Sequence, residues 1–306
     1  MTIIPYTFTP LPSFPPTLLP NTLFYNATST LTNLTYQISL SYPFSWGSPS
    51  LPTTQISTNT PPLTIYITDG NALFFTAADH IKRRKPVDST QPDILAVGIG
   101  YPLTDNVYAL SQRNIDFGVP VSGPVQVNDF VQFINSTLRP WVREQVFPGV
   151  RFGRDAIYGH SSGGWFVAYG LSRAPELFDT WIAGSPSLTV RTGSVLEEVT
   201  KGLGNGMEIK GEIPEGGEKP AVWIGYGDVE DYLVRRRTET EKLFQGRKER
   251  LKGYGGGPGR GSRDLYDRLV GSGRMRDVVV KEYEGMDHAG VGGACLLDGI
   301  NYFMDW

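Results

Sequence analysis

A serine between two glycines is the residue of this sequence best suited to nucleophilic chemistry. Ser161 is the central residue of the run Gly159–Gly163, which has the spacing Gly-x-Ser-x-Gly. Because that spacing alone is a weak signal, its setting must carry the inference. The short apolar run 156–158 precedes it and a helix-forming run, 164–172, follows it, and this strand–turn–helix context exposes a serine hydroxyl on a strained turn. The alternative is a helix cap rich in glycine and serine, without chemistry.

Two segments are candidates for stabilising an oxyanion, the negative charge that forms when a serine attacks a carbonyl. Ser162 follows the predicted nucleophile at a helix start, where its N–H can donate to that oxygen. Asp69, Gly70 and Asn71 follow the predicted strand 63–68 and open a helix, so the amides of Gly70 and Asn71 are the second candidate. An ordinary Asx-type helix cap at the same place is the alternative interpretation.

A serine hydroxyl needs a base to remove its proton, and His288 is the candidate. It lies shortly after the predicted strand 278–283 and is the only histidine C-terminal to Ser161. In a fold of this kind the acid and then the histidine follow the serine along the chain. His160 is interpreted as a packing residue whose side chain points away from the hydroxyl, and His80 as an accessory residue at most.

The acid that orients this base is expected after the predicted strand 221–224. The following loop offers Asp228, Glu230 and Asp231. Asp228 is nearest to the strand end and follows a glycine, so we predict that it holds the tautomer of His288. The other two carboxylates are interpreted as the start of the next helix, where negative charge is favourable.

These residues would be positioned by strands that alternate with helices, a pattern that predicts an α/β fold with a mostly parallel sheet covered on both faces. We expect strands at 36–42, 63–68, 94–99, 155–158, 180–183, 221–224 and 278–283. We expect helices at 72–85, 127–147 with a break at Pro140, 163–172, 195–201, 230–244 and 264–270, and at the C-terminus. Such a fold would be an α/β-hydrolase fold, with residues 1–306 as a single domain.

Two segments depart from the alternation. Residues 1–35 are rich in Pro, Thr, Ser and Asn and are expected to form an N-terminal arm. Residues 246–276 hold nine Lys/Arg against three acidic residues around a glycine-rich centre. This insertion is interpreted as a solvated, flexible connection, with a mobile basic flap over an anionic substrate as the alternative.

Composition excludes several classes of protein. A net charge of −3 gives no reason to expect a nucleic-acid partner. The single cysteine, Cys295, excludes an internal disulfide framework, and the three histidines show no metal-ligand spacing, so neither a metal nor a cofactor is expected. No apolar stretch approaches the roughly 20 residues of a membrane span, and the N-terminus lacks the pattern of an export signal. We therefore expect a cytoplasmic protein without a membrane partner.

The ordered set of motifs resembles the putative-esterase (esterase D-like) family of α/β hydrolases, over roughly residues 36–300. The motifs are Tyr66–Asn71, Val97–Pro102, Arg113–Phe117, Gly159–Gly164 and Asp287–His288. Within that family, the Asp-Gly-Asn and Arg-x-x-Asp-aromatic elements look most like siderophore esterases. The proline-rich start and the Gly/Arg-rich insertion look like a fungal branch, whose substrates would be cyclic hydroxamate esters of the fusarinine type.

The resemblance implies roles for further residues. It implies that Gly70, Asn71 and Ser162 form the oxyanion hole, and that Arg113 faces the substrate cleft. Arg113 and Trp165 are the candidate substrate-binding residues. From the residues alone, Arg113 and Asp116 are equally well interpreted as a structural ion pair. Two departures stand out: the usual hydrophobic residue after the nucleophile is a serine here, and some relatives use a Ser–His dyad, which would leave Asp228 dispensable.

The resulting prediction is a serine carboxylic-ester hydrolase that acts through an acyl-enzyme on a small-molecule ester, such as a ferric hydroxamate siderophore. Any iron would arrive with that substrate. One alternative is a general intracellular esterase of the S-formylglutathione hydrolase kind. Another is a hydrolase-fold binding protein without catalysis, which would ordinarily have lost Ser161 or His288.

Overall fold

A single sheet of nine strands runs through the described part of the protein. The computed structural model describes residues 6–10, 20–46, 60–102, 106–118, 127–188, 218–251 and 257–306. The strands are β1 (Tyr6–Pro10), β2 (Thr22–Ser29), β3 (Thr35–Ser41), β4 (Leu63–Thr68), β5 (Ile94–Gly100), β6 (Asp155–His160), β7 (Thr180–Gly184), β8 (Ala221–Gly227) and β9 (Asp277–Tyr283). The α-helices are α1 (Gly70–Val87), α2 (Leu110–Asp116), α3 (Val127–Phe133), α4 (Ser162–Arg173), α6 (Glu241–Leu251), α7 (Gly257–Ser272) and α8 (His288–Met304).

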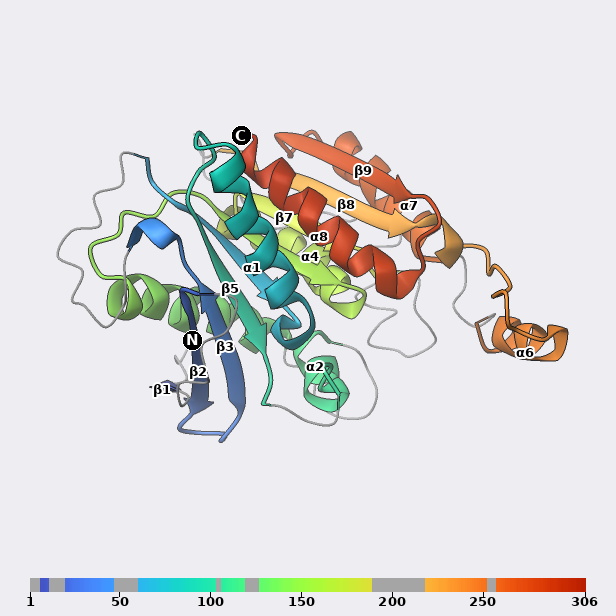
Figure 1. Cartoon of the computed structure of the whole chain (residues 1–306), viewed down its shortest axis with the longest axis horizontal. Helices are drawn as coiled ribbons and strands as arrows, with labels where there is room; N and C mark the ends of the chain where they lie inside the picture. The colour runs from blue at the N-terminus through green and yellow to red at the C-terminus, as the bar shows by residue number, and fades with distance from the viewer. Residues whose placement is uncertain are drawn as a thin grey trace.

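The sheet has the spatial order β1-β2-β3-β5-β4-β6-β7-β8-β9. The six strands β5, β4, β6, β7, β8 and β9 are parallel to one another, and β3, β2 and β1 extend the sheet beyond β5 with antiparallel pairing. Parallel neighbours require a crossover, which helices supply in the connections that the structure describes, such as α1 between β4 and β5 and α4 between β6 and β7 (Figure 1). The prediction of an α/β fold with a mostly parallel sheet is confirmed.

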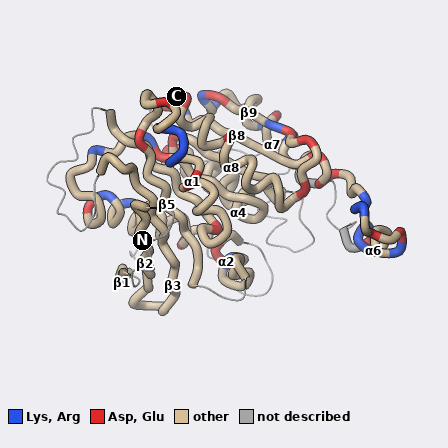
Figure 2. Tube along the Cα trace, in the orientation of Figure 1, with Lys and Arg blue, Asp and Glu red and all other residues tan. Residues whose placement is uncertain are grey.

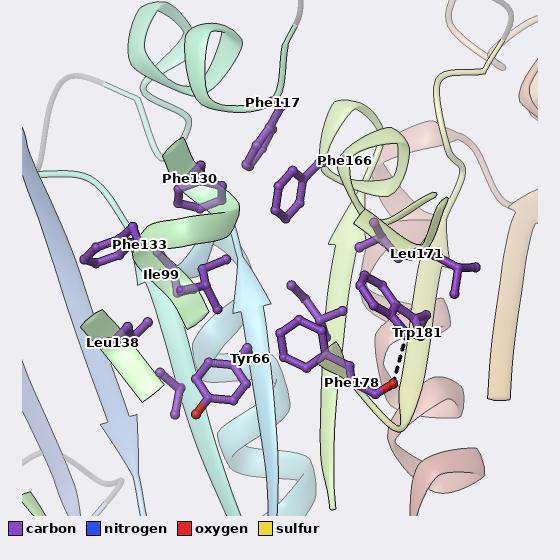
Figure 3. Packing of buried hydrophobic residues seen from close by; sticks show 14 of the residues in the cluster. Tyr66, Ile99, Phe117, Phe130, Phe133, Leu138, Phe166, Leu171, Phe178 and Trp181 are labelled. Atoms are coloured by element: carbon purple, nitrogen blue, oxygen red, sulfur yellow. Dashed lines mark hydrogen bonds between the residues drawn. The ribbon is translucent and has the colours of Figure 1, made fainter. Parts of the chain in front are cut away.

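The two faces of the sheet carry separate cores, because successive strand side chains point to opposite faces. On β4, Ile65 and Ile67 belong to the core under α1 and α8, whereas Tyr66 belongs to the core under α3, α4 and α7. Figure 3 shows the second core, in which Phe166 of α4 packs on Phe117, with ring centroids 5.5 Å apart. Burial on both faces explains why the central strands are almost continuously apolar in sequence.

The N-terminal arm contains two strands that the sequence analysis did not identify. β1 and β2 lie within residues 1–35, and β2 pairs along its length with β3. Threonine and aromatic residues favour strands, and the proline-rich composition of the arm obscured this local preference. Pro10 is tolerated because it ends β1, at the edge of the sheet.

The insertion 246–276 is largely helical rather than a flexible connection. The predicted helix 264–270 is part of the longer α7, whose Leu265 and Leu269 are buried against the sheet. α6 extends away from the body of the protein and carries both Lys/Arg and Asp/Glu (Figures 1 and 2). The centre of the insertion, 252–256, lies outside the described residues, so the flap interpretation stays untested.

Other helices differ in their boundaries from those predicted. The predicted helix 230–244 does not form as one element, because residues 231–240 are irregular and α6 begins only at Glu241. The predicted helix 127–147 becomes α3 followed by two π-helical turns, one on each side of Arg139 and Pro140. The predicted helix 195–201 lies outside the described residues. Of the helices that the structure describes, none has the length and apolarity to cross a membrane.

Candidate active site

The turn that carries Ser161 joins the end of β6 directly to the start of α4. Ser161 has a φ of 60° and a ψ of −117°, a strained conformation for a residue with a side chain. The flanking glycines are required by close contacts: a Cβ on Gly159 would lie 2.2 Å from the carbonyl oxygen of Gly163. One on Gly163 would lie 2.8 Å from Thr68 Oγ1. The geometry is therefore that of a strand–turn–helix motif that presents a serine hydroxyl.

The contact at Gly159 predicts a large loss of stability on a minimal substitution. We expect Gly159→Ala to lower the free energy of unfolding by about 2–3 kcal/mol, since the added methyl group cannot fit without moving the backbone. Urea denaturation followed by circular dichroism measures this. Gly271→Ala is the matched control, because no atom lies within 4 Å of its added Cβ, and we expect it to be neutral or slightly stabilising. Equal effects of the two substitutions would contradict this account of the turn.

The structure brings Ser161 and His288 together, as the sequence predicted. His288 is the first residue of α8, and its Nε2 lies 2.9 Å from Ser161 Oγ. Its other ring nitrogen, Nδ1, lies 2.6 Å from Glu230 Oε2. A hydroxyl, an imidazole and a carboxylate in this order can transfer the hydroxyl proton to the imidazole while the carboxylate stabilises the resulting cation.

The carboxylate beside His288 is Glu230 and not the predicted Asp228. The Glu230 side chain is only 2% exposed. Its Oε1 accepts hydrogen bonds from Gly227 N at 2.8 Å and from Ser185 Oγ at 2.5 Å, which leaves Oε2 for the imidazole. Both oxygens are thus held by hydrogen-bond partners, which fixes the position of the carboxylate beside His288.

Asp228 has a different partner, and the local backbone explains why. Residues 228–230 form one 3₁₀ turn directly after β8. This turn carries Glu230 back over the strand end, while Asp228 Oδ1 accepts from Gly285 N at 2.8 Å. Asp228 therefore links the end of β8 to the turn after β9. A sequence signal for this existed: a Glu three residues after the residue that starts a helical turn often bonds back to its amide, as Glu230 does with Gly227.

Two serines near this site were not singled out from the sequence. Ser185, directly after β7, has a φ of 40°, is fully buried and donates to Glu230. Ser187 Oγ lies 3.4 Å from Ser161 Oγ, and its backbone N–H donates to the Ser161 carbonyl at 3.1 Å. The loop after β7 thus contacts both the carboxylate and the hydroxyl. No local motif marks such residues, because the contacts depend on the pairing of β7 with β6 and β8.

His160 packs against the base itself. Its ring centroid lies 4.6 Å from that of His288, and the residue is 5% exposed. Burial, with the neighbouring His288 and Arg113 as further causes, lowers the pKa of His160 to about 3. His160 is therefore neutral at ordinary pH. The predicted packing role agrees with this position, in contact with the ring of His288.

The lowered pKa of His160 predicts a pH-dependent stability. An unfolded histidine binds a proton below about pH 6.5, whereas the folded protein does not protonate His160 until far lower pH. The stability that neutral His160 contributes is fully present above about pH 6.5, and it is lost as the pH falls below that value. Between about pH 7.5 and pH 5, we expect the wild type to lose about 2 kcal/mol more unfolding free energy than His160→Gln. Urea titrations at the two pH values measure this, and parallel losses would contradict it.

The predicted oxyanion donors lie at two helix starts on the same edge of the sheet. Gly70 is the first residue of α1 and Ser162 the first of α4, and amides in a first turn have no partner within their helix. The side chain of Asn71 is held away from its helix: Nδ2 donates to Tyr101 O at 2.8 Å, and Oδ1 accepts from Tyr101 N at 2.7 Å. The side chain thus anchors the start of α1 to the end of β5.

Arg113 and Trp165, the predicted substrate-binding residues, are both buried. Arg113 is 6% exposed and forms an ion pair with Asp69, not with Asp116. Asp116 instead accepts from Tyr101 Oη at 2.9 Å. Trp165 is 3% exposed and stacks on Tyr169 within α4. Helix α4 is covered on nearly all sides, and sequence periodicity could not distinguish a ring in a cleft from a ring in this core.

The parallel sheet, the strained serine turn and the serine–histidine–carboxylate geometry together define an α/β hydrolase. A family model described as "Putative esterase" matches residues 48–249, more than half of the chain. The siderophore enterobactin esterase of Emericella nidulans is 33% identical over 282 residues, covering 87% of this chain and 88% of that protein. The siderophore triacetylfusarinine C esterase of Aspergillus fumigatus is 31% identical over 277 residues, or 89% of each chain.

A solved structure agrees with these sequence comparisons. Siderophore hydrolase EstA from Aspergillus nidulans superposes with a TM-score of 0.81 at 29% identity, covering 96% of this chain and 98% of that one. The chain belongs to the putative-esterase family, as its motifs predicted, and it is a hydrolase that acts on ester bonds.

Proposed function

We propose that the chain is a serine carboxylic-ester hydrolase that opens the ester bonds of a siderophore through an acyl-enzyme. The observation that carries this proposal is the continuous set of contacts from Ser161 Oγ through His288 to Glu230, at 2.9 and 2.6 Å. Ester hydrolysis requires an activated serine, because a serine hydroxyl without a base is too weak a nucleophile to attack the ester carbonyl. The His288 side chain is half-exposed and Ser161 is partly exposed, so the pair lies at the protein surface.

The reaction follows from these positions in two halves. Ser161 Oγ attacks the ester carbonyl as its proton moves to His288 Nε2, and Glu230 stabilises the imidazolium. The oxyanion is held by the amide of Ser162 and by those of Gly70 and Asn71. The tetrahedral intermediate collapses as His288 returns the proton to the leaving alcohol. Water, deprotonated by the same histidine, then cleaves the acyl-enzyme and regenerates the serine.

The substrate class is supported by the two relatives that match nearly the whole chain. One is named for enterobactin, a catecholate ester, and the other for triacetylfusarinine C, a hydroxamate ester. We propose the cyclic hydroxamate triester of the fusarinine type, free or with bound iron, as the substrate of this chain. The catecholate ester is the second candidate, favoured by the 33% identity to the enterobactin esterase.

Mass spectrometry of the products tests the substrate directly. The enzyme is incubated with triacetylfusarinine C and with enterobactin, each iron-loaded and iron-free, and Ser161→Ala serves as the control for contaminating esterases. We expect linear and monomeric products from the hydroxamate with the wild type only. Cleavage of enterobactin alone would select the catecholate. Brisk hydrolysis of p-nitrophenyl acetate with neither siderophore opened would instead indicate a general esterase.

Two further properties belong to this proposal. We propose that residues 1–306 form one domain, supported by the continuous sheet from β1 to β9. We also propose a cytoplasmic location, where a siderophore ester would be opened after uptake. Fractionation of cells that express the tagged chain tests the location, and recovery of the active enzyme outside the cell would contradict it.

A further inference from the structure

Asp69 occupies the position before α1, where an aspartate ordinarily caps a helix, but its side chain does not act as a cap. It is 2% exposed and has the left-handed φ of 54° and ψ of 43°. Within residues 60–102, its carboxylate makes no hydrogen bond to the amides of α1. It binds Arg113 instead, with Oδ1 2.6 Å from Nε and Oδ2 2.9 Å from Nη2.

Arg113 holds two segments of the site at once. It lies on α2, beside the start of α1 (Figure 1), and its Nη2 also donates to the carbonyl oxygen of His160 at 3.2 Å. The rings of Tyr108 and Phe117 flank the guanidinium, with centroids 5.5 and 5.1 Å from Cζ. One buried guanidinium thus joins the turn after β4 to the end of β6, directly before Ser161.

These two segments carry the oxyanion donors of the proposed reaction. Gly70 and Asn71 follow Asp69, and Ser162 lies two residues after His160. The segments are in close contact, since a Cβ on Gly163 would lie 3.5 Å from Asp69 Oδ2. We propose that Arg113 and Asp69 are positioning residues that keep the first amides of α1 open for the oxyanion. This inference rests on the proposed esterase mechanism.

The physical reason lies in what Asp69 would bind without Arg113. Aspartate is among the preferred N-cap residues because its carboxylate accepts from the amides of the first turn. A buried carboxylate without its cation needs other donors, and the amides of Gly70 and Asn71 follow it directly in the chain. Bound there, the Asp69 side chain would occupy the amides that the oxyanion needs. The ion pair therefore keeps the carboxylate turned away from the site.

Rescue by a second substitution tests this role. With p-nitrophenyl acetate as substrate, we expect Arg113→Met to lower kcat about 100-fold, with KM changed less than about threefold. Inhibition by phenylboronic acid, whose serine adduct places an oxygen at the oxyanion position, should weaken by a similar factor. The double variant Arg113→Met/Asp69→Gly should regain at least about tenfold of the lost kcat, because glycine adopts the positive φ and has no carboxylate.

Each alternative gives a different result. A KM raised tenfold with kcat unchanged would show that Arg113 contacts substrate, and would overturn the proposal. A double variant no more active than Arg113→Met would overturn it too. If Arg113→Met does not fold, the same comparison is made with Arg113→Lys, which keeps the charge but loses the two-point contact. A wild type that hydrolyses no ester would refute the esterase mechanism itself, a failure distinct from that of the ion pair.

Discussion

Ser161→Ala is expected to lower kcat for ester hydrolysis by about 10⁵–10⁶-fold, leaving only the acceleration that binding and the oxyanion hole provide. The Ser161 hydroxyl lies 2.9 Å from the His288 nitrogen that would accept its proton. Initial rates with p-nitrophenyl acetate measure the loss. Labelling with a fluorophosphonate followed by peptide mass spectrometry should place the adduct on Ser161 in the wild type and give none in the variant.

Ser187→Ala is the matched control for this prediction. Ser187 Oγ is 3.4 Å from Ser161 Oγ, so it is the hydroxyl that could substitute for the nucleophile or assist it. We expect the control to retain activity within about tenfold of the wild type, since the serine–histidine contact is intact. A fluorophosphonate adduct on Ser162 or Ser187, or more than a hundredth of the activity in Ser161→Ala, would contradict the assignment of the nucleophile.

Glu230→Gln is expected to lower kcat by about 10³–10⁴-fold while the fold is retained. Glutamine keeps the shape of the side chain and an oxygen for Gly227 N, but the group that faces His288 is no longer a negative charge. The imidazole then loses its tautomer control and the stabilisation of its cation. Steady-state rates across about pH 6–9, together with thermal unfolding to verify the fold, measure this effect.

Asp228→Asn tests whether Glu230 or Asp228 is the acid that acts on His288. Asparagine can still accept from Gly285 N, so the link from β8 to the turn after β9 persists. We expect activity within about tenfold of the wild type. A greater loss from Asp228→Asn than from Glu230→Gln would restore the acid assignment predicted from the sequence. Small losses from both would indicate a serine–histidine dyad.

The sequence predicted those parts of the site that are encoded locally. The nucleophile turn was found because its glycines, strand and helix are contiguous in the chain. His288 was found because only one histidine follows Ser161. The central strands were found because burial on both faces leaves apolar runs of characteristic length.

The parts that depend on tertiary geometry could not be predicted in this way. Three carboxylates lie within four residues after β8, and only the direction of the 3₁₀ turn decides which one reaches the imidazole. The family resemblance implied that Arg113 faces the substrate cleft, whereas the structure places it in a buried ion pair. Its partner Asp69 is 44 positions away, and no spacing rule relates the two. β1 and β2 were missed because edge strands with mixed polarity carry a weak pattern.

The spacing of the three residues along the chain has a consequence for how activity is acquired. Ser161 and His288 are 127 positions apart and become neighbours only when β6, β7, β8 and β9 are all paired. Contacts between residues so far apart in the chain form late, because the entropy cost of closing a long loop comes before the contacts can stabilise the structure. During refolding, recovery of ester hydrolysis should therefore lag behind recovery of the helical circular dichroism signal. Ester hydrolysis would then report when β9 and α8 pack onto the rest of the sheet.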